Sequence, residues 1–270
     1  MTSEILRSDI FGEIAIREWF ERNLPKLTFC QKNVSEMFTA QMKQDFFHFE
    51  GNAQALRLVT RLHYLVDEHG MNLTYALLNT IIKYPGSSLQ IDENSGNIKD
   101  RKMGYYFADE EIFHKVTKET GAGRNRHPLT YMLEAADDLA YKTADIEDSF
   151  VKGFIRYADL ERELKELEEK KRNGTFRPAY RLRQLYERGI QKRVHDPESY
   201  AVKNWIVNAQ GFLLNCATEG FMANYDAIMS GKFGQDLFYG TNGEELMELL
   251  GDMADRYVFF INGNLQDGSI

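Results

Sequence analysis

Asp137, Tyr141 and Asp145 repeat at every fourth position of one segment and form a row of carboxylate, phenol and carboxylate. An α-helix turns once in about 3.6 residues, so this spacing places the three side chains on one helical face. Such a row could bind a divalent metal at one end and a sugar hydroxyl at the other. An acidic helix face that pairs with Lys or Arg has the same spacing, so spacing alone leaves both interpretations open.

The residues that precede this row place acids among apolar neighbours. The run Glu134-Ala-Ala-Asp-Asp138 has small alanines, which let another helix or a ligand approach closely. An unpaired carboxylate in apolar surroundings is costly. We therefore expect a cationic group to compensate the acids of this segment.

Helices are the elements that would position these side chains. Prolines are few, five in 270 residues, and apolar residues recur at intervals of three and four. The pattern predicts an all-α protein with helices over residues 10–29, 52–69, 74–82, 128–149, 159–172, 178–193, 198–228 and 243–256. Residues 87–101 are expected to form an exposed loop or short hairpin, and residues 257–261 a short strand or a buried helix end. The apolar side of the 128–149 helix would carry Leu129, Met132, Leu133, Ala136, Leu139 and Ala140.

The composition restricts the class of protein. A hydrophobic content of 43% is enough for a real core, and a net charge of −8 without a long Lys or Arg block argues against nucleic acid as a partner. Cys30 and Cys216 lack the spacing of a disulfide scaffold or thiolate metal site, so we expect buried thiols. The N-terminus has no apolar signal region, and no run of 18 apolar residues occurs, which predicts a cytoplasmic protein without a membrane partner.

Four blocks of residues, in order, resemble the dGTP triphosphohydrolase (dGTPase) family of the HD-domain superfamily. They are Phe49-Glu-Gly-Asn-Ala-Gln54, Leu73-Thr-Tyr-Ala76 through Lys83-Tyr-Pro85, Lys102-Met-Gly-Tyr-Tyr106, and the segment from Arg126 to Tyr141 with its Glu-Ala-Ala-Asp-Asp core. The resemblance extends over about 130 residues. It implies an HD-type helical bundle and the hydrolysis of dGTP, or another deoxynucleoside triphosphate, to deoxynucleoside and triphosphate.

The resemblance also implies a role for each matching residue. Asp137 corresponds to a ligand of a divalent metal, Mn or Mg, and Glu13 to an acid that transfers protons. Tyr141 and Asp145 correspond to contacts with the deoxyribose. The triphosphate contacts would be Asn52, Lys83, Tyr84 and Lys102, and two lysines suit a ligand with roughly four negative charges. Family members also commonly form homo-oligomers.

The chain departs from the family pattern at its N-terminus. Only Phe11-Gly-Glu13 matches the tail of the family's catalytic stretch, and Ile10 or its neighbour stands where a catalytic histidine is expected. The one His-Asp pair, His195-Asp196, lies outside every matching block. We therefore expect an N-terminally incomplete bundle in which the metal-binding part is missing, and one carboxylate would hold Mn²⁺ or Mg²⁺ weakly.

Three functions follow as alternatives. The first is a dGTPase-like hydrolase, inactive if this chain is a fragment; the second is a degenerate member that binds dNTP and regulates or assembles with an intact paralogue. A purely structural interaction module ranks last. In each case residues 1–157 would form the partial nucleotide-binding core, and residues 158–270 a helical C-terminal region packed on it.

Overall fold

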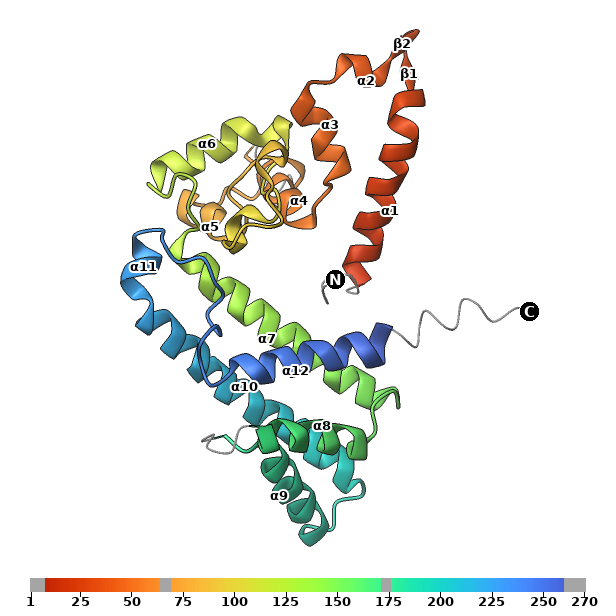
Figure 1. The fold of residues 1–270 in the computed structure, drawn as a ribbon, viewed down its shortest axis with the longest axis vertical. Coiled ribbons are helices and arrows are strands. Elements are labelled where there is room, and N and C mark those ends of the chain that lie inside the picture. Colours follow the sequence, from red (N-terminus) through yellow and green to blue (C-terminus); the bar gives the residue numbers. More distant parts are fainter. Residues whose placement is uncertain (1–7, 64–68, 171–175, 260–270) are drawn as a thin grey trace, which may run out of the picture. The chain divides into compact units, whose positions relative to one another are not determined.

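The computed structural model describes residues 8–63, 69–170 and 176–259 and confirms the all-α prediction (Figure 1). Its helices are α1 (Ser8–Asn23), α2 (Val34–Met37), α3 (Ala40–Phe47), α4 (Gly51–Arg57), α5 (Tyr75–Thr80), α6 (Glu110–Glu119), α7 (Pro128–Val151), α8 (Tyr157–Lys170), α9 (Pro178–Gln191), α10 (Pro197–Ala223), α11 (Tyr225–Met229) and α12 (Glu244–Ala254). In these parts of the chain the strands are β1 (Thr28–Phe29) and β2 (Lys32–Asn33), which pair antiparallel.

The described residues divide into two compact units, and the division falls within α7. Residues 8–134 and 224–236 form the first, here called the N-terminal unit, and residues 135–223 with 237–259 the second, the C-terminal unit. The predicted domain boundary at residue 157 stays a prediction.

Apolar side chains from α4, α5 and α6, from the residues just after α5 and from the loop before α6 make the core of the N-terminal unit. Its buried members are Leu56, Leu78, Ile82, Tyr105, Phe113 and Val116. The rings of Tyr105 and Phe113 stack with their centroids 4.0 Å apart. The loop that precedes α6 is thereby fixed against the helices, and this loop carries Lys102.

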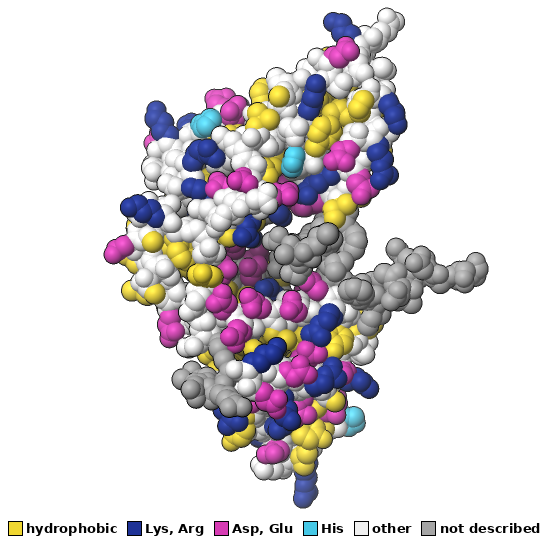
Figure 2. Space-filling model, in the orientation of Figure 1, with side chains coloured by type: hydrophobic (Ala, Val, Ile, Leu, Met, Phe, Trp, Pro, Cys, Tyr) yellow, Lys and Arg dark blue, Asp and Glu magenta, His cyan; other side chains and the backbone are white. Residues whose placement is uncertain are grey.

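The C-terminal unit is built around α10. Trp205 is fully buried, and its indole N–H donates to the carbonyl of Pro178 at the start of α9 (3.0 Å). Gly220 is required where α10 meets the segment before α12, because a Cβ there would lie 2.0 Å from the Leu237 carbonyl oxygen. Figure 2 shows Lys, Arg, Asp and Glu side chains interspersed on the visible face of this unit.

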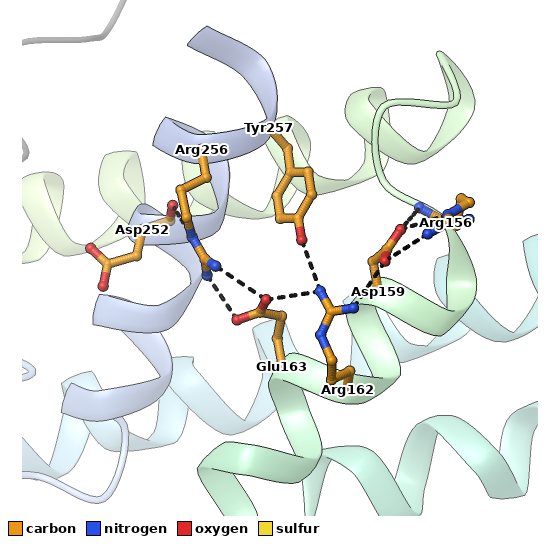
Figure 3. Close-up of polar contacts among 7 residues, drawn as sticks. All are labelled: Arg156, Asp159, Arg162, Glu163, Asp252, Arg256 and Tyr257. Atoms are coloured by element: carbon orange, nitrogen blue, oxygen red, sulfur yellow. Dashed lines mark hydrogen bonds and ion pairs between the residues drawn. The ribbon is translucent and has the colours of Figure 1, made fainter. Parts of the chain in front are cut away.

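Ion pairs join α8 to the π-helical turn Asp255–Phe259, which follows α12. The carboxylate of Glu163 accepts from Arg256 (2.8 and 3.1 Å) and from Arg162 (3.3 Å), while Asp159 accepts from Arg156 and Arg162 (Figure 3). The Tyr257 hydroxyl accepts from Arg162 at 3.2 Å. We call these residues the arginine network; their guanidinium groups lower the pKa of Glu163 and of Asp159.

Several predicted helix bounds were wrong. The first helix stops at Asn23, because a 3₁₀ turn with Pro25 and then the β1–β2 hairpin follow it. The 52–69 pattern forms α4 and a π-helical turn, Leu58–Leu62, and residues 64–68 lie outside the described part. The 198–228 pattern breaks at Asn224 into α10 and α11. The sequence reasoning missed α2, α3 and α6 entirely.

Two predictions of exposure and burial also need correction. Cys216 is buried as expected, but Cys30 is exposed, because it occupies the turn of the β1–β2 hairpin. The predicted apolar side of α7 is largely exposed in Leu129, Met132 and Leu133. The buried positions of α7 are instead Tyr131, Ala135, Thr143, Ile146 and Ser149, together with Thr130. Burial therefore follows a side of α7 that is partly polar.

No helix in the described part of the chain is long and apolar enough to cross a membrane.

Candidate functional site

Glu50 is the centre of the candidate site in the N-terminal unit. It is 2% exposed and precedes α4, where its carboxylate accepts from the Asn52 amide Nδ2 at 2.7 Å. Arg17 and Lys102 each place a nitrogen near its Oε2, at 3.3 and 3.2 Å. A carboxylate directly before a helix can accept from backbone N–H groups that have no partner inside the helix, and Glu50 does so for Asn52. The position of Glu50 is thus set by the start of α4, whereas its cationic partners come from elsewhere: Arg17 from α1 and Lys102 from the loop before α6.

Glu13 of α1 meets the same helix start. Its Oε1 accepts from the backbone N–H of Gly51 at 2.7 Å, and its Oε2 lies 3.3 Å from Arg17. Burial, first, and the neighbouring charge of Glu50, second, raise the pKa of Glu13 above its ordinary value. Glu13 therefore retains its proton to a higher pH than a free glutamate.

A close contact of two backbone segments brings Lys102 to Tyr84. The ammonium group lies over the Tyr84 ring, 5.9 Å from its centroid. Gly104 is required here, because a Cβ at this position would lie 1.8 Å from the Tyr84 carbonyl oxygen. The Lys102 side chain is 35% exposed, so its ammonium group remains accessible to a ligand while Glu50 holds it.

Arg126 fixes the turn that contains Lys83 and Tyr84. It is 3% exposed, donates from Nε to the Lys83 carbonyl at 2.7 Å, and forms a two-pronged ion pair with Glu134. Its guanidinium also lies over the Tyr84 and Tyr131 rings. Arg126 compensates Glu134 at the start of the acidic run, whereas a cationic partner for Asp137 and Asp138 stays a prediction.

The third group of predicted residues lies on α7. Asp137, Tyr141 and Asp145 share one side of this helix, with Tyr141 exposed and both carboxylates half-buried. They belong to the C-terminal unit, whereas Glu13, Asn52, Lys83, Tyr84 and Lys102 belong to the N-terminal unit. The structure thus brings Glu13, Asn52 and Lys102 together at Glu50, with Tyr84 beside Lys102, and this cluster does not include the α7 row.

The described residues do not fit a resident metal. Within them no group of three or more His, Cys, Asp or Glu side chains is arranged to hold a metal ion. Among the described residues, Asp137 therefore does not belong to a group of side chains that could fix a divalent ion. No catalytic step is assigned to a metal here.

The sequence reasoning missed four residues of the site. These residues are Glu50, Arg17, Tyr106 and Arg126. Glu50 lies in one of the blocks that resemble the family, and Arg17 follows Glu13 by one helical turn. The Tyr106 hydroxyl donates to the Glu50 carbonyl at 3.1 Å, and burial raises its pKa. An acid directly before a Gly-Asn helix start is the signal that could have identified Glu50.

Comparison with known proteins places this geometry in context. No family model matches the chain. The chain is 44% identical over 251 residues to a deoxyguanosinetriphosphate triphosphohydrolase-like protein of Listeria monocytogenes, a match that covers 92% of this chain and 52% of the relative. It is 32% identical over 274 residues to a deoxyguanosinetriphosphate triphosphohydrolase of Yersinia enterocolitica, with the same coverage. A similar protein of Pseudomonas aeruginosa is 31% identical over 240 residues, 86% of this chain and 49% of the relative.

The chain spans about half the length of the curated relatives that it matches. The matched part includes nine-tenths of its residues, at identities far above chance. By this similarity the chain belongs to the deoxyguanosinetriphosphate triphosphohydrolase family.

Proposed function

We propose that the chain binds a deoxynucleoside triphosphate and takes part in its hydrolysis to deoxynucleoside and triphosphate. The binding site is the Glu50 cluster, which consists of Glu13, Arg17, Glu50, Asn52 and Lys102. One observation carries the proposal: two cations and an amide converge on one buried carboxylate beside Tyr84. The names of the relatives give dGTP as the first substrate to test.

Lys102 and Asn52 supply donors for the phosphate oxygens. Ammonium-to-phosphate hydrogen bonds are charge-assisted and about twice as strong as neutral ones. Glu50 holds both donors in place before a ligand arrives, which reduces the entropy lost on binding, but its negative charge also competes with the phosphate for them. Tyr84 and the turn anchored by Arg126 would place Lys83 along the same phosphate chain.

Glu13 is the residue that could transfer a proton. Its raised pKa lets it keep a proton nearer to neutral pH than an exposed glutamate does, as a general acid requires. For the α7 row we propose the roles that the family resemblance implies: Tyr141 and Asp145 contact the deoxyribose, and Asp137 binds a metal supplied with the nucleotide.

Binding without turnover is the second candidate. It is favoured by the lack of a three-ligand metal group among the residues described. A chain that holds dNTP without hydrolysing it could regulate or assemble with an intact paralogue.

A paired measurement on the purified chain separates the candidates. Calorimetry with dGTP reports binding, and release of triphosphate with Mn²⁺ reports turnover. Lys102→Ala should weaken dGTP binding by about tenfold or more, since it removes a charged hydrogen bond. Lys118→Ala, which removes an exposed lysine on α6 of the same unit, should leave binding unchanged.

Each outcome decides one point. Binding with triphosphate release supports the hydrolase, and binding alone supports the second candidate. Lack of dGTP binding by the folded chain, or equal effects of the two lysine variants, contradicts the nucleotide site.

A further inference from the structure

Helix α10 is apolar on two sides, but the C-terminal unit covers only one of them. The buried side contains Val202, Trp205, Ala209, Leu213 and Ala217. The opposite side is exposed along Val207, Gly211, Leu214, Thr218 and Met222, which follow one another at intervals of three or four residues. Val207, Leu214 and Met222 are 65%, 60% and 65% exposed. Helices that are apolar all round are normally buried all round.

Gly211 lies in the middle of this exposed stripe, and no contact among the described residues explains it. A Cβ built on it meets nothing within 4 Å, so none of the described residues requires a glycine there. Apart from proline, glycine is the least favourable residue inside a helix. A glycine on a helix surface allows a second helix to approach closely, as small residues do where two helices cross.

The charges that flank Gly211 indicate what the second helix is. Lys203 precedes it by eight residues and Glu219 follows it by eight, and both are exposed. At about 1.5 Å per residue each lies about 12 Å from Gly211 along the axis. If two copies of α10 pair antiparallel with Gly211 at the crossing point, Lys203 of one copy is level with Glu219 of the other.

The crossing angle brings these charges together. Lys203 and Glu219 project from opposite flanks of the stripe, about 80° to either side of Gly211, at 100° per residue. In an antiparallel pair that crosses at about −50°, the commonest class in globular proteins, each helix shifts sideways by some 5 to 6 Å at that level. The shift moves the ammonium group of one copy toward the carboxylate of the other.

We propose that the chain forms a homodimer in which two α10 helices cross antiparallel at Gly211. Val207 and Leu214 pack beside the crossing point, and reciprocal Lys203–Glu219 pairs set the direction. The surface fits a second copy because its charges are complementary to those of its own two-fold image. The proposal is independent of the nucleotide site.

Disulfide formation tests the crossing point. In a Cys30→Ser background, Gly211→Cys should give a covalent dimer on mild oxidation. With helix axes about 8 to 10 Å apart, the two facing Cα atoms would lie about 3.5 to 5.5 Å apart, which overlaps the disulfide range. Ile190→Cys, at an exposed position of α9, is the matched control and should stay monomeric under denaturing, non-reducing conditions.

Sedimentation of the unmodified chain over a range of concentrations tests the interface. Leu214→Glu should weaken dimerisation by about tenfold or more, while circular dichroism shows an unchanged helix content. Lys203→Glu and Glu219→Lys should each weaken the dimer by a few-fold, and the double exchange should restore it.

A chain that stays monomeric at all concentrations overturns the proposal and means that something other than a second copy covers the stripe. A dimer that is insensitive to Leu214→Glu, with no Gly211→Cys cross-link, overturns it too and places the interface elsewhere.

Discussion

The two units handle buried carboxylates in opposite ways. In the arginine network, Asp159 and Glu163 face three guanidinium groups, which lower the pKa of both acids. In the Glu50 cluster, Glu13 and Glu50 share Arg17 and Lys102, and the pKa of Glu13 is raised. The arginine network has three guanidinium groups for two acids, whereas the Glu50 cluster has two cations for two acids.

This difference separates a structural contact from a site. Guanidinium groups in excess stabilise ionised acids and join α8 to the turn that follows α12. In the Glu50 cluster two carboxylates share two cations, the Lys102 side chain is partly exposed, and the pKa of Glu13 is raised. Such a balance is typical of residues that act on a ligand.

The largest effect is expected at Arg126, which anchors the turn that contains Lys83 and Tyr84. Arg126→Met should lower the free energy of unfolding by about 3 to 5 kcal/mol, because it leaves Glu134 without its buried partner and the Lys83 carbonyl without a donor. Urea unfolding measures the change. A loss below about 1 kcal/mol would mean that Glu134 relaxes into solvent and that the turn does not depend on this pair.

Glu50→Gln should affect stability and ligand binding in opposite directions. The amide keeps an acceptor for Asn52 but no longer neutralises Arg17 and Lys102, so unfolding should need about 1 to 3 kcal/mol less. Triphosphate should bind more tightly, because a competing negative charge has gone. If calorimetry finds weaker binding, Glu50 positions the donors more than it competes with the ligand.

Glu163→Gln is the matching change in the arginine network and should affect stability alone. We expect a loss of about 1 kcal/mol near neutral pH and unchanged dGTP affinity. Because the pKa of Glu163 is lowered, its contribution is present above the ordinary glutamate value of 4.5 and is lost as the pH falls through the lowered pKa. Wild type and variant should therefore converge in acid; a gap that persists there contradicts the ion-pair explanation.

Glu13→Gln should show the smallest effect and the opposite pH dependence. The pKa of Glu13 is raised, so the protonated acid stabilises the fold below its ordinary value of 4.5, and this contribution is lost as the pH rises through the raised pKa. The variant should therefore gain stability relative to wild type between pH 4.5 and the raised pKa of Glu13. Unfolding curves at several pH values measure it, and parallel curves would show that Glu13 titrates as an exposed acid.

The sequence by itself determined the helical class and the α7 row. Residues four apart share a helical face wherever the helix packs, so Asp137, Tyr141 and Asp145 could be grouped from periodicity alone. The same local rule predicted the bounds of α9 within two residues. It missed α6, where charged residues outnumber apolar ones, although Phe113 and Val116 are buried.

Only the tertiary structure decided the Glu50 cluster. Glu13, Glu50 and Lys102 are far apart in sequence, and no periodic pattern relates an acid before α4 to a lysine in a loop. Their pairing depends on the core of α4, α5 and α6, and on Gly104, whose close contact with Tyr84 brings Lys102 into place. Local patterns determine which face of a helix a residue takes, whereas burial and charge balance depend on what packs against that face.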